Sequence, residues 1–167
     1  MAYARFLLAL MLAWAAVAPV SRAAAQTVTT TLSANVSAIA RLTVSTASVS
    51  FPDADPDAIP QVPAAGGPIL ITTRTRATGS SQVVLSVLAI DDLRSGVTII
   101  PASNITWTST GAGFVGGGTL STSTPVTLAT WSGSGLRSGS QQLFFRNLWT
   151  HPTGTYTLSM LYTLSAP

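Results

Sequence analysis

The stretch Thr155–Ser165, TYTLSMLYTLS, determines the fold class that the sequence predicts. Every second residue is large and apolar, and the residues between are threonine, serine or leucine. Side chains of a β-strand point alternately to its two faces, so this pattern indicates a strand with one buried face. That face would consist of Tyr156, Leu158, Met160, Tyr162 and Leu164.

Further segments of the same character occur throughout the chain. Residues Gln82–Ile90, QVVLSVLAI, are strongly apolar and are expected at the centre of a sheet. Other strands are expected near residues 49–51, 69–76, 97–100, 105–108, 126–131 and 142–149. Turn-forming residues separate them at Gly79–Ser81, Asp91–Gly96, Ser132–Ser140 and His151–Gly154, and a proline-rich loop is expected over Pro52–Pro68.

No helical period is found after the first 25 residues. The sequence therefore predicts an all-β fold, an immunoglobulin-like antiparallel β-sandwich of about eight or nine strands. The large residues expected in its core are Trp107, Leu85, Val87, Tyr156, Leu158 and Tyr162.

Residues Thr27–Val44 also alternate, with apolar side chains mostly on even positions. This segment is expected to be one long, half-buried strand, or two strands with a kink near Ile39–Ala40. Two roles remain open for it. It can be the first strand of its own sandwich, or it can complete the sheet of a neighbouring molecule as a donor strand.

The N-terminus has the plan of a secretory signal peptide: Arg5, an apolar run Phe6–Val20, and Ala23–Ala25 before Gln26. The run is shorter than the roughly 20 residues that a membrane span needs. We therefore expect residues 1–25 to be removed, leaving a single domain over residues 26–167 with no membrane span. The protein would be exported to the periplasm, the cell surface or the medium.

Charge is scarce. From Gln26 onward the chain has six arginines and five aspartates, with no lysine, glutamate or cysteine. Without a basic run, nucleic acid is not an expected partner. Few charges along many strands also leave sheet edges poorly protected, so the protein is expected either to cover its edges or to use them.

Candidate sites for chemistry are few. Asp53, Asp55 and Asp57 space three carboxylates by two residues and could form a calcium site, although Ala58 and Ala64 stand where an EF-hand loop needs glycine and glutamate. The alternative is that they solvate the loop and cap its turns. His151 is the only histidine, and it has no nucleophile or second ligand marked by a motif.

Asp91 and Asp92 are adjacent in the sequence. Neighbouring residues of a strand point to opposite faces, so the two carboxylates are not expected to act as a catalytic pair and are better explained by a turn. The chain is therefore expected not to be an enzyme and to need no cofactor.

Aromatic residues offer an alternative function, because they can stack on sugar rings, although in a sandwich they more often form the core. The aromatic residues in question are Trp107, Phe114, Trp131, Phe144, Phe145, Trp149, Tyr156 and Tyr162.

The final 14 residues, Gly154–Pro167, resemble the ending of bacterial WxL-type surface domains, a β-rich family whose Gly-Thr-Tyr strand precedes a Trp-x-Leu motif. Tyr162 stands in place of the tryptophan, with Leu164 at the leucine. The plan of the chain also resembles pilin-like subunits of chaperone–usher systems and spore-coat-U-like proteins, without the usual pilin disulfide.

These resemblances imply that the sandwich is pilin-like rather than immunoglobulin-like, and both forms remain open. They also imply a structural or adhesive bacterial surface subunit that acts through strand edges and surface contacts. Its partner would be another copy or another surface subunit, bound by strand pairing. The alternative is a module that binds carbohydrate or cell-wall polysaccharide.

Overall fold

The computed structural model describes residues 28–167, and within them the chain is all-β apart from one short 3-10 turn, η1 (Ala102–Asn104). The strands are β1 (Ile39–Val44), β2 (Gln61–Pro63), β3 (Ile69–Arg76), β4 (Gln82–Ala89), β5 (Leu93–Ser95), β6 (Thr98–Ile100), β7 (Ile105–Gly111), β8 (Gly117–Thr119), β9 (Val126–Ser132), β10 (Gly135–Arg146) and β11 (Met160–Ser165). The predicted all-β sandwich is confirmed, with more short strands than expected.

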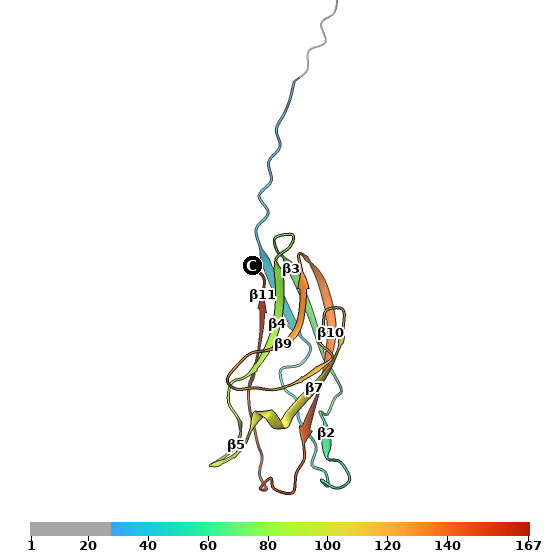
Figure 1. Cartoon of the computed structure of the whole chain (residues 1–167), viewed down its shortest axis with the longest axis vertical. Helices are drawn as coiled ribbons and strands as arrows, with labels where there is room; N and C mark the ends of the chain where they lie inside the picture. Colours follow the sequence, from blue (N-terminus) through green and yellow to red (C-terminus); the bar gives the residue numbers. More distant parts are fainter. Residues whose placement is uncertain (1–27) are drawn as a thin grey trace, which may run out of the picture. The chain divides into compact units, whose positions relative to one another are not determined.

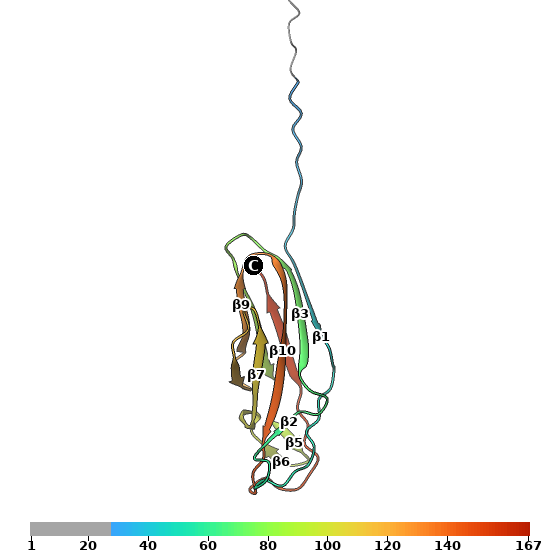
Figure 2. The same cartoon turned by 90° about the vertical axis from the view of Figure 1, so that its right-hand side faces the viewer.

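The larger sheet has the strand order β1-β3-β10-β7-β8, and every pair in it is antiparallel. The short strand β2 pairs with the last residues of β10. Figure 2 shows β1, β3 and β10 side by side in this layer. Because β10 is long, its first half pairs with β3 and its second half with β2, so it ties the two ends of the sheet together.

The smaller sheet has the order β11-β4-β9 and packs against the larger one. Strand β4 alternates strictly, and its inward side chains are completely buried. They meet inward residues of the larger sheet, so the core lies between the two layers. The fully buried side chains include Val83, Leu85, Val87, Ala89, Ile71, Trp107, Leu128 and Leu143.

The sandwich has two distinct ends. At the end that we call the C-terminal end, β11 finishes at Ser165, β3 finishes at Arg76 and β10 begins at Gly135. At the opposite end, which we call the loop end, β2, β5 and β6 gather with the connections before and after them (Figures 1 and 2). Because neighbouring strands are antiparallel, they run in opposite directions between these two ends.

One predicted turn is wrong. Residues Ser132–Ser140 were expected to form a glycine- and serine-rich turn, but β10 begins at Gly135 and runs through most of this segment. The reason is that residues 135–140 pair with β3, and residues 139 and 140 pair with β7 as well, and this pairing outweighs the low strand propensity of Gly and Ser. Gly139 also has a packing role, because a Cβ there would lie 2.5 Å from the Phe114 ring.

The long N-terminal strand is only partly present. It begins at the expected kink, Ile39, and residues 28–38 have no strand structure. Ile39 pairs with Arg76, the last residue of β3, so the ladder offers no further partner to the residues before it. The predicted signal peptide, residues 1–25, lies outside the described residues.

The core prediction divides into two groups. Trp107, Leu85 and Val87 are buried, as expected. Tyr156, Leu158 and Tyr162 point inward but are only half-buried. All three belong to β11 or to the segment that leads into it. Their partial exposure shows that the sandwich is less closed on the β11 side.

Candidate functional site

The smaller sheet has two edge strands, and one of them is covered. Along β9, the Thr130 amide donates to the Gly113 carbonyl at 2.8 Å, and the Val115 amide donates to the Leu128 carbonyl at 3.0 Å. Phe114 forms an isolated bridge with Ala129. Since residues 113–115 belong to the β7–β8 connection, the larger sheet closes over the β9 edge and no free row of backbone groups is left there.

The other edge strand, β11, pairs on one side only. Its ladder joins Met160–Ser165 to β4. The lead-in continues along the same side, where Thr157 exchanges two backbone hydrogen bonds with Arg94, each of 3.0 Å. Within the described residues no backbone hydrogen bond is made along the opposite side of this segment, although β1 comes close to part of β11, so the segment keeps donors and acceptors that another strand could pair with.

A groove of about 530 Å³ lies beside this free edge. One wall comes from the inward side chains of Tyr156–Tyr162, and the other from the end of β1 and the segment after it. Its floor consists of core residues of the larger sheet and the loop end. The apolar lining residues are Val44, Ala47, Val49, Ile69, Leu93, Ile105, Leu143, Tyr156, Leu158, Met160 and Tyr162.

Tyr162 provides the polar group nearest the core on this wall. Its hydroxyl donates to the Oε1 atom of Gln141, a fully buried residue of β10, at 2.6 Å. Burial raises the pKa of the Tyr162 phenol to about 12, because an apolar surrounding disfavours the phenolate. The phenol is therefore neutral at physiological pH and links β11 of the smaller sheet to β10 of the larger sheet.

Residues 28–38, which we call the arm, join the sandwich at Ile39. They retain the alternation seen in the sequence, with Val28, Leu32 and Val36 on one face and threonine, serine or asparagine between them. The three large apolar side chains are 85%, 91% and 65% exposed. These apolar side chains therefore keep the spacing of a strand while they lie exposed to solvent.

The structure does not bring Asp53, Asp55 and Asp57 together as a metal site, and no group of three or more potential metal ligands is found in residues 28–167. The carboxylates are instead used in the loop. Asp55 accepts the Asp57 amide at 2.9 Å, and Asp57 accepts the Trp149 indole N–H at 3.0 Å. This corresponds to the alternative in which the aspartates cap turns.

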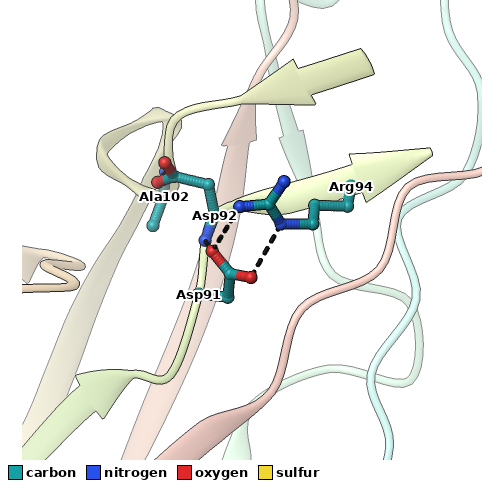
Figure 3. A network of polar contacts seen from close by, with 4 residues as sticks. All are labelled: Asp91, Asp92, Arg94 and Ala102. Carbon is teal, nitrogen blue, oxygen red and sulfur yellow. Dashed lines mark hydrogen bonds and ion pairs between the residues drawn. The ribbon is translucent and has the colours of Figure 1, made fainter. Parts of the chain in front are cut away.

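Asp91 and Asp92 also have structural contacts (Figure 3). Asp91 forms a bidentate ion pair with Arg94, with distances of 2.7 and 3.1 Å, and Asp92 accepts the Ala102 amide at 2.8 Å. The hydrogen bond from Arg94 lowers the pKa of the Asp91 carboxyl. The two carboxylates therefore fix the turn that leads into β5, as expected from their adjacency.

His151 lies in the turn after β10, half-buried against the Phe145 ring at 5.3 Å. Burial, and secondarily the charge of Arg146, lowers the pKa of its imidazole.

Of the aromatic residues considered for sugar stacking, Trp107 and Trp131 are in the core, whereas Trp149 is 70% exposed. Trp149 is thus the aromatic residue most open to a ligand.

Sequence reasoning identified the inward face of the last strand but missed the opposite wall of the groove, formed by Val44 and Val49. The only sequence feature that marked this wall was the short segment 45–48, which separates the strand predicted up to Val44 from the one predicted from Val49.

In the part of the chain that the structure describes, no helix is long and apolar enough to span a membrane. The chain matches no protein-family model and no curated protein.

Proposed function

We propose that the protein is an exported, non-enzymatic structural subunit of the bacterial surface that assembles by strand exchange. The arm of one copy lies in the groove beside β11 of the next copy and completes its smaller sheet. The observation that carries this proposal is the free edge of β11 beside an apolar groove, in a chain whose own alternating arm is exposed.

The dimensions of arm and edge agree. An extended segment rises about 3.3 Å per residue, so residues 28–38 can reach about 36 Å. The edge segment Tyr156–Ala166 has the same number of residues, and β1, which comes close to β11, would have to move aside for the arm to pair along its whole length. An arm strand would satisfy the unpaired backbone groups of β11 and place Val28, Leu32 and Val36 on the groove side, which is the pattern of strand addition to an exposed edge.

The resemblance to pilin-like subunits supports the same proposal, since it implies a small sandwich, an alternating N-terminal segment and no catalytic residues. Export is part of the proposal and rests on the N-terminal sequence. N-terminal sequencing of the exported protein should begin at Gln26, within a few residues, and recovery of a membrane-bound form that still begins at Met1 would contradict it.

Deletion of residues 28–38 tests strand exchange. The intact protein should form polymers that are visible by size-exclusion chromatography and electron microscopy, and the deleted variant should remain folded but monomeric. A synthetic peptide of residues 28–38 should bind the deleted variant. The control peptide carries Leu32→Asp and Val36→Asp and should not bind, because a charge in the groove is left without a partner.

An intact protein that stays monomeric at high concentration would contradict the proposal. Unfolding of the deleted variant would also contradict it, because the arm would then belong to its own sandwich.

A second function, carbohydrate binding, is favoured by Trp149. Its indole is exposed, yet the N–H is held by Asp57 at 3.0 Å, so the ring has a fixed orientation. A fixed, exposed indole is suited to stacking on a sugar ring. Co-sedimentation with insoluble peptidoglycan and polysaccharides tests this function. Binding should be lost in Trp149→Ala and retained in Leu136→Ala, an exposed apolar residue at the other end.

A further inference from the structure

Three arginines lie together on the outer face of the larger sheet. Arg41 of β1 is directly opposite Arg74 of β3, and Arg76 follows two residues later on the same exposed face. We call these three residues the arginine patch. Arg41 and Arg74, together with Thr43 and Thr72, line a shallow depression of about 360 Å³.

The arginine patch is electrostatically unfavourable in the isolated subunit. Like charges placed directly opposite each other on neighbouring strands destabilise the pair. Within residues 28–167, the one ion pair joins Arg94 to Asp91, so no carboxylate of this range compensates the patch. An anionic group bound from outside would relieve the repulsion, and the guanidinium groups and threonine hydroxyls offer donors for carboxylate oxygens.

The complementary group is present at the other end of the same sandwich. Residues 53–57, which we call the acidic loop, carry three exposed aspartates and no cation. The loop is fixed to the chain after β10, since Asn147 donates to the Ala54 carbonyl at 2.8 Å and Trp149 donates to Asp57 at 3.0 Å. Arg146, which pairs with Gln61, lies at this end too. Its single positive charge is smaller than the negative charge of the three aspartates.

Strand exchange would bring these two surfaces together. The arm leaves the sandwich at Ile39, which pairs with Arg76 of the arginine patch. The groove that receives it opens at the loop end, where Val49, Ile69 and Leu93 line it. If residues 28–36 occupy the groove, only two residues remain before β1, a reach of about 7 Å. The donor's arginine patch would then face the end of the acceptor that carries the acidic loop.

We infer that the arginine patch of one copy docks on the acidic loop of the next copy and thereby orients strand exchange head to tail. This inference rests on the proposed function. The arm supplies the affinity through backbone pairing and apolar contacts. The charges supply orientation and speed of association, because complementary potentials steer encounter and disfavour approaches that bring like charges together.

A charge swap tests the inference in the full chain. One variant carries Arg41→Glu and Arg74→Glu, and the other carries Asp53→Arg and Asp55→Arg; Asp57 is kept because it holds Trp149. Because Asp55 accepts the Asp57 amide, Asp55→Asn is measured beside them to separate any change of the loop from the change of charge. Each variant alone should polymerise about tenfold more slowly than the unaltered protein at low salt. An equal mixture should recover the rate, because every contact in an alternating polymer is again between opposite charges.

Three controls make the outcome specific. Thr108→Glu with Thr119→Glu adds negative charge to the same sheet but away from the arginine patch, and should leave the rate unchanged. High salt should reduce the difference between the variants and the unaltered protein, since it screens exposed charges. The synthetic arm peptide should bind arm-deleted forms of the two swap variants as tightly as it binds the arm-deleted protein, because the groove is unaltered.

Failure of this inference differs from failure of the proposed function. If the unaltered protein polymerises and both swap variants do so at the same rate, or if the mixture stays slow, the docking of patch on loop is overturned and strand exchange stands. If the arm peptide does not bind, strand exchange is overturned and the inference falls with it.

Discussion

The two edge strands of the smaller sheet, β9 and β11, flank the same central strand but have different surroundings. On β9, Leu128 and Ala129 are fully buried, and residues 113–115 pair with the edge. On β11, Met160, Tyr162 and Leu164 are half-buried, and the edge is free. The comparison shows that the burial of an edge strand's inward side chains depends on two things. One is the alternation of its sequence, and the other is whether a further segment covers its free side.

The largest difference should come from truncating the closed side. Leu128→Ala should lower the free energy of unfolding by about 2–5 kcal/mol, because the surrounding side chains cannot collapse into the cavity. Urea denaturation measures it. Leu136→Ala, at an exposed position of β10, serves as the control and should change stability by less than about 0.5 kcal/mol. A similarly small effect at Leu128 would mean that the β9 side is not closed.

The closure itself can be broken at Gly113. This residue has φ +88°, and a Cβ there would lie 2.8 Å from the Thr130 carbonyl oxygen that faces it. Gly113→Ala should therefore cost about 1–3 kcal/mol through strain and loss of the pairing with β9. The matched control is Gly116→Ala, since a Cβ at Gly116 meets nothing within 4 Å and its φ is not positive. Equal unfolding midpoints for the two variants would show that residues 113–115 do not hold this edge.

The sequence predicted the strands far better than it predicted this difference between the edges. Alternation in Gln82–Ile90 and Thr155–Ser165 is a local property of the chain, so it could be found without knowing the neighbours, although only Met160–Ser165 of the second stretch forms a strand. Whether a side is closed depends on contacts between distant segments, such as Val115 with Leu128. The apolar face of β11 was therefore recognised, but its half-buried state was not.

The same limit explains the errors at Ser132–Ser140 and in the arm. In the first case pairing with β3, and at Gly139 and Ser140 also with β7, imposes strand structure on glycine and serine. In the second, an alternating segment has no neighbour within its own sheet, because β3 ends at Arg76. The groove could not be predicted from sequence either, since its walls come from segments more than 100 residues apart.

On the open side, truncation should have a smaller effect. Leu158→Ala removes a half-buried side chain of the groove wall and should lower the free energy of unfolding by about 1 kcal/mol in the arm-deleted protein, because water already reaches one side of it. The cost should increase when the arm peptide is added, since the peptide covers the groove. Urea denaturation with and without peptide measures both values. A cost as large as that of Leu128→Ala would mean that the β11 side is closed.

The smallest expected effect is the pH dependence that Tyr162 gives to the open side. Its phenol has an ordinary pKa near 10 in the unfolded chain and a pKa of about 12 in the folded protein. Between pH 10 and pH 12 the unfolded chain loses this proton first, so Tyr162 makes stability fall as pH rises through this window and has no such effect below pH 10.

Tyr162→Phe should remove this part of the pH dependence, although it should lower stability at neutral pH by about 1 kcal/mol through loss of the hydrogen bond to Gln141. Urea denaturation over the alkaline range, with tyrosinate absorbance as a second readout, measures the effect. If the arm covers the groove, adding the arm peptide should move the ionisation of Tyr162 to still higher pH, because the phenolate would lose its remaining contact with water. If the Tyr162 phenol ionises near pH 10 both without and with the peptide, the side chain is in water. It would then not belong to the wall of a groove that the arm fills.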